Sequence, residues 1–206
     1  MPLGSDRTKR AYEQWAAQYD QDPNPQLVLE FEDVLRVVDP KPGEAILDAA
    51  CGTGRYTVAF HTRGADVLGI DFSAGMVAQA RRKNPALRFV IADLREPLPL
   101  VADTFDAVNC AQALKHLPSL RTPVTEFARV LKPGGILRLL EYVRPRGPLR
   151  SFIAGLWEPW IAWAYGAGFD RRTEEHVREV GLEILEVRFA VDDLVKLISV
   201  RAHPTS

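Results

Sequence analysis

Short apolar runs alternate with amphipathic stretches along most of the chain, and both have the lengths of ordinary secondary-structure elements. The apolar runs predict strands at 45–49, 66–71, 87–92, 105–110, 136–142, 183–190 and 194–201. Apolar side chains at spacings of three and four predict helices at 5–19, 26–38, 54–63, 74–83, 121–130 and 173–180. Strands that alternate with helices indicate an α/β fold, in which helices cover a mostly parallel sheet.

The two ends of the chain depart from this alternation. Residues 1–40 hold two helical patterns without a strand, and we interpret them as an N-terminal helical cap. A short acidic connection through Asp192 and Asp193 joins the last two predicted strands. Because so short a connection cannot hold a crossover helix, these two strands should be antiparallel neighbours. The length of 206 residues fits a single domain, 1–206.

The segment after the first predicted strand is the most informative part of the sequence. Asp48 stands near the end of that strand, and Gly52 and Gly54 lie in the turn before the next helix. Glycine lets the backbone approach a ligand closely, and a helix start offers N–H groups to a carboxylate or a phosphate. A nucleotide-binding dehydrogenase also uses such a turn, but its G-x-G-x-x-G fingerprint requires glycine where this chain has Thr57. An acid just ahead of the glycines would repel a pyrophosphate, whereas it suits an α-ammonium group.

Two further acids end the second and third predicted strands. Asp71 follows Gly52 by 19 positions (71 minus 52), close to the interval expected of a carboxylate that accepts both ribose hydroxyls. Asp93 could accept the exocyclic amine of adenine, with Leu94 and Met76 against the ring. Acids at three successive strand ends therefore predict a site for an adenosine compound.

These motifs resemble the class I S-adenosylmethionine (SAM) dependent methyltransferases, in particular the branch that includes the ubiquinone and menaquinone methyltransferases. The resemblance covers roughly residues 12–140, and its specific parts are 47–54, 69–73, 92–93 and 127–135. It implies a Rossmann-like seven-stranded sheet in the order 3-2-1-4-5-7-6, with strand 7 antiparallel and helices on both faces. It also implies SAM as the cofactor. Ala50 departs from the pattern, because many members have glycine there, and we expect little loss from so small a residue.

The resemblance assigns parts of the cofactor to parts of the chain. The methionine moiety is expected on Asp48 and the glycine turn, the ribose on Asp71 and the adenine on Asp93. Tyr12 and Tyr19 could close over the cofactor, as the N-terminal helix does in similar enzymes, or serve as core residues. The expected cofactor-binding residues are Tyr19, Asp48, Ala50, Cys51, Gly52, Thr53, Gly54, Asp71, Phe72, Met76, Ala92, Asp93, Leu94 and Cys110.

Candidate catalytic residues follow the fourth predicted strand. Methyl transfer is an in-line attack, so catalysis requires alignment, desolvation and, for some acceptors, proton removal. The strand end at 109–112 should line the methyl-transfer position. Gln112 is a candidate for orienting the acceptor, and His116 is a candidate base, with packing as the alternative role of this histidine.

Composition and charge give no sign of nucleic acid, a disulfide framework or a metal ion. The net charge of -1 gives no reason to expect nucleic acid. The 2 cysteines cannot form a disulfide framework, and no Cys/His cluster has zinc spacing, so no metal is expected. The sequence shows neither a leader nor an apolar run of about 18 residues, so we expect a cytoplasmic protein. We expect it to be a monomer or a homodimer.

An aromatic-rich segment, 144–170, suggests what the acceptor is. It holds three of the 4 tryptophans, and Arg144, Arg146 and Arg150 lie at its start. It could be a lid, make peripheral contact with a membrane surface through 144–169, or simply cover the sheet. Residues 144–202 resemble, more weakly, the phospholipid N-methyltransferases and membrane-associated thiol methyltransferases. A lipophilic acceptor such as a phospholipid amine is therefore our first expectation.

Other functions stay open at this point. Within the methyltransferase interpretation, the acceptor could be a quinone ring carbon or a small thiol or amine. A nicotinamide-dependent oxidoreductase and a non-catalytic SAM-binding protein are the alternatives from other classes.

Overall fold

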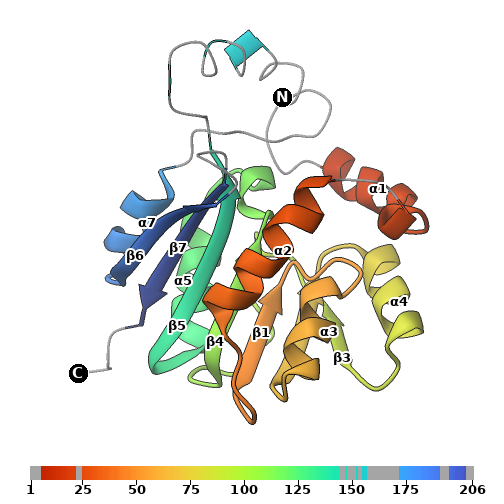
Figure 1. The fold of residues 1–206 in the computed structure, drawn as a ribbon, viewed down its shortest axis with the longest axis horizontal. Coiled ribbons are helices and arrows are strands. Elements are labelled where there is room, and N and C mark those ends of the chain that lie inside the picture. The colour runs from red at the N-terminus through yellow and green to blue at the C-terminus, as the bar shows by residue number, and fades with distance from the viewer. Residues whose placement is uncertain are drawn as a thin grey trace.

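Seven strands form one sheet in the order β3-β2-β1-β4-β5-β7-β6 (Figure 1). The computed structural model describes residues 6–21, 25–143, 147, 152, 155–156, 172–190 and 195–202. Strand β7 is antiparallel to β5 and β6, and the other neighbours are parallel. The strand order implied by the family resemblance, with strand 7 antiparallel, is confirmed. The strands are β1 (Ala45–Ala49), β2 (Asp66–Asp71), β3 (Arg88–Ile91), β4 (Phe105–Ala111), β5 (Leu131–Tyr142), β6 (Glu183–Ala190) and β7 (Val195–Arg201).

Helices cover both faces of this sheet (Figure 1). The near face in Figure 1 carries α2 (Pro25–Val38), α3 (Arg55–Thr62) and α4 (Ala74–Lys83), and the far face carries α5 (Arg121–Val130) and α7 (Thr173–Glu179). The remaining elements are the helix α1 (Asp6–Trp15) and the 3-10 helices η1 (Tyr19–Gln21) and η2 (Leu114–His116).

The inner strands β1, β4 and β7 are buried on both faces, as their continuous apolar sequences require. On β1, Ile46 belongs to the apolar cluster with α2 and α3, while the next residue, Leu47, belongs to the cluster with α5 and α7. Phe60 and Phe127 are fully buried, one on each side. Two well-packed layers therefore hold the strand ends, which carry the candidate site, in fixed positions.

Two elements differ from the sequence prediction. Residues 132–135 precede the predicted strand 136–142, yet they lie within β5, where the register with β4 shifts after Phe105↔Leu131 and resumes at Ala107↔Ile136. Gly134 has a left-handed backbone (φ 77°) in this irregular part of the strand. The first predicted helix ends at Trp15 rather than at residue 19, and Tyr19 begins η1.

Most of the aromatic-rich segment 144–170 lies outside the described residues. Of its members that are described, Phe152 and Leu156 are exposed. No helix among the described residues is both long and apolar enough to cross a membrane.

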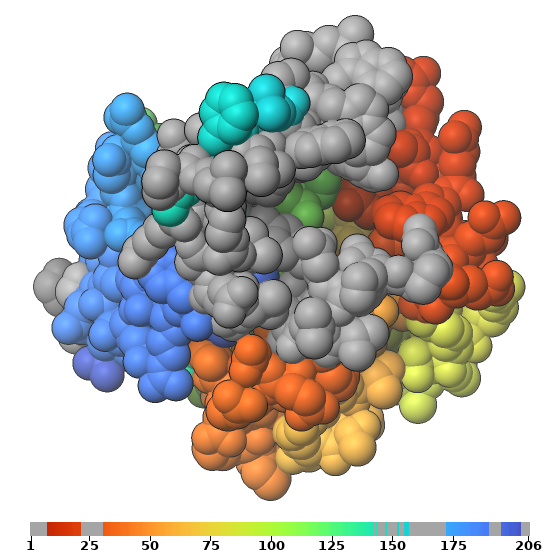
Figure 2. Space-filling model, turned by 45° about the horizontal axis from the view of Figure 1, so that its top comes forward, coloured from red at the N-terminus to blue at the C-terminus, as the bar shows by residue number. Residues whose placement is uncertain are grey.

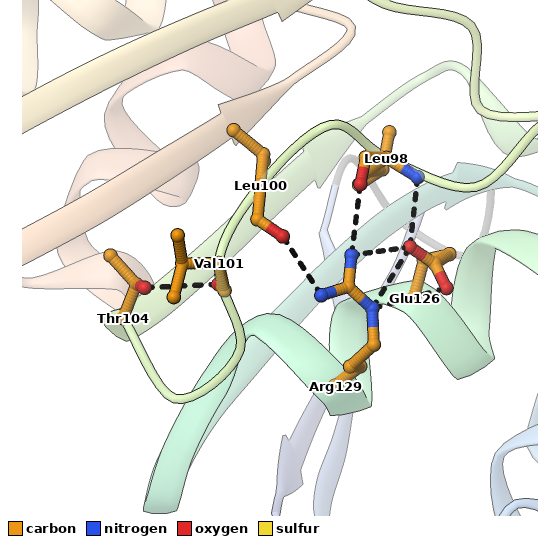
Figure 3. A network of polar contacts seen from close by, with 6 residues as sticks. All are labelled: Leu98, Leu100, Val101, Thr104, Glu126 and Arg129. Atoms are coloured by element: carbon orange, nitrogen blue, oxygen red, sulfur yellow. Dashed lines mark hydrogen bonds and ion pairs between the residues drawn. The ribbon is translucent and has the colours of Figure 1, made fainter.

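A polar network fixes the loop between β3 and β4 to α5 (Figure 3). The guanidinium of Arg129 donates to the carbonyl oxygens of Leu100 (2.8 Å) and Leu98 (3.0 Å), and it also pairs with Glu126 at 2.7 Å. The Glu126 carboxylate in turn accepts from the Leu98 backbone N–H at 2.8 Å. Because this loop begins just after Asp93, the network holds one wall of the candidate site.

Replacing Arg129 by methionine is expected to lower the free energy of unfolding by about 2 kcal/mol, because two carbonyls and one carboxylate lose a charged donor. Urea unfolding measures this change. Arg121→Met, at the exposed start of the same helix, is the matched control and should change stability by less than about 0.5 kcal/mol. Equal effects of the two substitutions would contradict a structural role for the network.

Candidate functional site

A pocket opens where β1, β2, β3 and β4 end, and it encloses about 760 Å³ including its open mouth. Figure 2 looks obliquely onto this edge, with α1 (red) along one side and the C-terminal elements (blue) opposite. The expected site residues that line the pocket are Tyr12, Tyr19, Ala50, Gly52, Asp71, Phe72, Met76, Ala92, Asp93, Leu94, Ala111, Gln112 and His116. The expected residues outside this lining are Asp48, Cys51, Thr53, Gly54, Asn109 and Cys110.

The loop after β1 has an unusual backbone. Ala50 (φ 59°), Gly52 (φ 56°) and Gly54 (φ 89°) are all left-handed. A Cβ added to Gly52 would meet nothing within 4 Å, so this residue presents bare backbone to open space. A Cβ on Gly54 would lie 3.0 Å from the ring of Phe89. A left-handed backbone costs alanine on the order of 1 kcal/mol more than glycine. Ala50, where many members of the family have glycine, therefore stores backbone strain next to the pocket.

Asp71 joins this loop to the end of β2. Its Oδ2 accepts from the Gly52 backbone N–H and its Oδ1 from that of Ser73, both at 2.9 Å. Burial raises the pKa of Asp71 to about 6, although both backbone N–H groups favour the charged form. The carboxylate still lines the pocket, and each oxygen has a second lone pair for a ligand hydroxyl.

Asp48 lies beneath the loop and not in the pocket wall. It is 1% exposed, and its carboxylate accepts from the Thr57 hydroxyl (2.6 Å) and from the Asn109 amide (2.9 Å). Burial raises its pKa to about 6, against the opposing effect of these hydrogen bonds. This position differs from the direct ligand contact that we expected. The Asp48 carboxylate is hydrogen bonded to Thr57 and Asn109, two partners that sequence spacing does not predict.

Asp93 is occupied by a partner that we did not predict. Arg95 donates to it through Nε and Nη2 at 3.0 and 2.6 Å, and both residues line the pocket. Partial burial acts to raise the pKa of Asp93, but the hydrogen bonds from Arg95 outweigh it and the pKa lies below its usual value. An adenine amine would therefore share this carboxylate with a guanidinium.

The N-terminal helix is tied to the rest of the site by side chains. Glu13 accepts from the backbone N–H groups of Ala74 and Gly75 at the start of α4, both at 2.7 Å. Asp20 accepts from the Thr53 hydroxyl (2.6 Å) and pairs with Lys83. These contacts place Tyr12 and Tyr19 over the pocket, and they explain why Thr53 is turned away from it.

The residues after β4 form the opposite wall. Gln112 has a left-handed backbone (φ 63°), and its N–H donates to the Leu140 carbonyl at 2.9 Å. Its side-chain oxygen accepts from Lys115 at 3.4 Å. His116 Nε2 lies 3.1 Å from the Tyr12 hydroxyl, so the candidate base and the N-terminal helix are in direct contact.

The two cysteines are buried, and neither is among the residues that line the pocket. Burial raises the pKa of the Cys51 and Cys110 thiols well above the usual value. They therefore stay neutral and act as small apolar residues.

Sequence reasoning missed several lining residues. Only Arg95 could have been found from the sequence, because it lies two positions after Asp93. The other three line the pocket because separate elements meet there. The missed residues are Thr8, Arg95, Ala113 and Leu117.

Comparison with known proteins supports the methyltransferase interpretation of the sequence. The family described as "Methyltransferase domain" matches residues 47–139. The demethylmenaquinone methyltransferase of Corynebacterium kroppenstedtii is 40% identical over 116 residues, which are 56% of this chain and 49% of that protein. The enzyme of the same name from Clavibacter sepedonicus is 41% identical over 117 residues, 55% of this chain and 47% of that protein. The chain thus spans about half the length of the curated relatives it matches.

Solved structures agree on the fold. A chain in a complex of the Haloferax volcanii Trm112 methyltransferase activator with a methyltransferase aligns with a TM-score of 0.74 at 21% identity, covering 93% of this chain and 97% of that chain. Residues 47–139 therefore match a methyltransferase domain, and the strand order is the one implied by the resemblance to the class I SAM-dependent methyltransferases. The two relatives agree with the resemblance of its motifs to the menaquinone-methyltransferase-like branch.

Proposed function

We propose that this protein transfers a methyl group from SAM to a ring carbon of a small apolar aromatic acceptor of the quinol type. The observation that carries the proposal is the composition of the pocket. Its cofactor side holds Gly52 and Asp71, whereas the wall after β4 includes the aliphatic residues Ala113 and Leu117. A flat apolar ring suits such a wall better than a charged headgroup does.

The names of the relatives favour the same acceptor class. Both enzymes named above are demethylmenaquinone methyltransferases, and nothing in the comparisons favours the phospholipid amine that we expected first. A phospholipid acceptor was expected mainly because of the aromatic-rich segment 144–170, most of which lies outside the described residues. The quinone-ring alternative therefore replaces it.

The residues of the pocket fit SAM. The open space at Gly52 allows close approach of the cofactor to the backbone, and Asp71 offers acceptors for ribose hydroxyls. Asp48 adds negative charge beneath the loop, which favours the cationic end of the cofactor through space. When bound, SAM supplies an electrophilic methyl group. The chain's own contribution is to align the acceptor along Gln112 and to exclude water with Tyr12, Tyr19 and Phe72.

One experiment separates this function from its rivals. Equilibrium binding to SAM, S-adenosylhomocysteine and NAD is measured first, and SAM is expected to bind at least about 100-fold more tightly than NAD. The protein is then incubated with SAM and either a reduced demethylnaphthoquinone or phosphatidylethanolamine vesicles. We expect a product one methyl group heavier from the quinol alone. NAD binding without SAM binding would indicate an oxidoreductase, and a methylated lipid would restore the phospholipid acceptor. SAM binding without any methylated product across a broad panel of acceptors, including thiols and amines, would indicate a non-catalytic protein.

A further inference from the structure

Tyr12 and His116 come from distant parts of the chain and meet inside the pocket. The Tyr12 hydroxyl lies 3.1 Å from His116 Nε2, and the two rings are edge to face with centroids 5.7 Å apart. Tyr12 belongs to α1 and His116 to η2, and both line the cavity. A polar pair held in an apolar cavity is costly unless it is hydrogen bonded, and this one is.

The position of the Tyr12 hydroxyl is fixed by packing around its ring. Phe72 lies edge-on at 5.9 Å, and Trp15 and Tyr19 lie at 6.1 and 6.5 Å. The neighbouring residue Glu13 anchors α1 to the start of α4 through two backbone N–H groups. The hydroxyl is therefore held between the wall that follows β2, where the cofactor is expected, and the wall that follows β4, where the acceptor is expected.

We propose that Tyr12 and His116 form a proton relay for an acceptor that carries an aromatic hydroxyl, an inference that rests on the proposed function. The acceptor O–H bond breaks as its proton passes to Tyr12 Oη, while the Tyr12 proton passes to His116 Nε2. The electron pair left on the acceptor oxygen increases the electron density of the ring carbon that bonds to the methyl group, and S-adenosylhomocysteine leaves. The ring then loses its C–H proton to solvent and the oxygen regains one from the histidine, so one proton is released overall.

Tyr12 is suited to pass a proton but not to hold a charge. Burial, together with nearby Tyr19 and Asp71, raises the pKa of Tyr12, so its phenolate is strongly disfavoured. A relay avoids that state, because Tyr12 gains one proton as it gives up another. His116 is then the group that becomes charged, next to a tyrosine and within the same pocket as Asp71.

The competing explanation is that the hydrogen bond only holds α1 closed over the cofactor. The two explanations differ in which step they affect. A purely structural contact would change the affinity for SAM, whereas a relay changes the rate constant for an acceptor that must lose a proton. An acceptor that is already ionised at the assay pH does not need the relay.

The test compares Tyr12→Phe and His116→Asn with the unchanged protein on two reduced naphthoquinones. One has weakly acidic hydroxyls, and the other carries fluorine substituents that ionise a hydroxyl at the assay pH. With the weakly acidic acceptor, kcat is expected to fall by about 100-fold in both variants. With the ionised acceptor it should fall by less than about 3-fold, and the Kd for SAM should stay within about 2-fold of the original. Tyr56→Phe, which packs between Phe31 and Phe60 away from the pocket, is the matched control and should leave all values within about 2-fold.

Each other outcome has a defined meaning. Equal losses with both acceptors, or weaker SAM binding with kcat intact, would overturn the relay and leave the proposed function standing. If the unchanged protein binds SAM but methylates neither acceptor, the proposed acceptor class fails and the relay fails with it.

Discussion

Replacing Asp71 by asparagine is expected to weaken SAM binding by about 100-fold, or nearly 3 kcal/mol. Both carboxylate oxygens accept a backbone N–H, from Gly52 and from Ser73, and an amide can accept only one of them. The amide NH2 would then face an N–H donor, and the loop would have to move. The same substitution also removes one of the acceptors that we assign to the ribose. Isothermal titration calorimetry at pH 7.5 or above, where the native carboxylate is ionised, measures the change.

The control lies on the same strand. Asp66 begins β2, is exposed, and pairs with Arg88 far from the pocket edge. Asp66→Asn should therefore leave the Kd for SAM within about 2-fold. If Asp71→Asn also binds SAM within about 3-fold of the original, Asp71 has no part in holding the cofactor.

Replacing Asp48 by asparagine should raise the stability of the ligand-free protein at pH 7.5 and weaken SAM binding at the same time. The pKa of Asp48 is about 6 in the folded protein against an ordinary value of 3.8, which corresponds to about 3 kcal/mol as an upper limit. An asparagine at this position can still donate to the Thr57 hydroxyl and accept from Asn109. It therefore keeps both side-chain contacts and removes the buried charge. Because that charge favours a cationic ligand through space, we expect SAM affinity to fall by about 10-fold.

Asp48 should make the ligand-free protein less stable as the pH rises from about 4 to 7.5. The folded state binds a proton more tightly than the unfolded state, so the contribution of Asp48 is fully present below about pH 4 and is lost as the pH rises through about 6. Asp71 has the same sign and the same window. Urea unfolding of the ligand-free protein between pH 4 and 7.5 should show this loss, and Asp48→Asn should reduce its slope.

Asp106 provides a contrasting substitution. Its carboxylate accepts from the Lys132 side chain and the Ala45 backbone N–H, which outweigh partial burial and lower its pKa. Asp106→Asn should therefore destabilise the protein at neutral pH, opposite to Asp48→Asn. If both substitutions are destabilising and the pH slope is unchanged, Asp48 is not a strained buried charge.

The fold could be predicted from the sequence because its main signals are local. Apolar runs gave the strands, and the short connection at 192–193 gave the antiparallel pair β6 and β7. The strand order itself required the family resemblance, since periodicity does not say which strands are neighbours. The fifth predicted strand begins later than β5 for a physical reason: Pro133 and two glycines are typical of a turn, but the chain pairs with β4 both at Leu131 and again from Ile136.

The site could be predicted only in part, because many of its contacts join residues far apart in the sequence. Asp71, Gly52 and Asp93 line the pocket because strand ends meet at one edge of the sheet. The hydrogen bonds that occupy Asp48 come from Thr57 and Asn109, and the latter lies 61 positions away. The contact between Tyr12 and His116 spans 104 positions. No spacing rule within a single element reports such contacts.

The central claim is that Asp71 and the loop at Gly52 hold the adenosyl compound in this pocket. A crystal structure with S-adenosylhomocysteine tests it most directly. We expect density for the ligand with its ribose hydroxyls within about 3 Å of the Asp71 carboxylate. Density elsewhere on the molecule, or a ribose with no contact to Asp71 at saturating ligand, would contradict it.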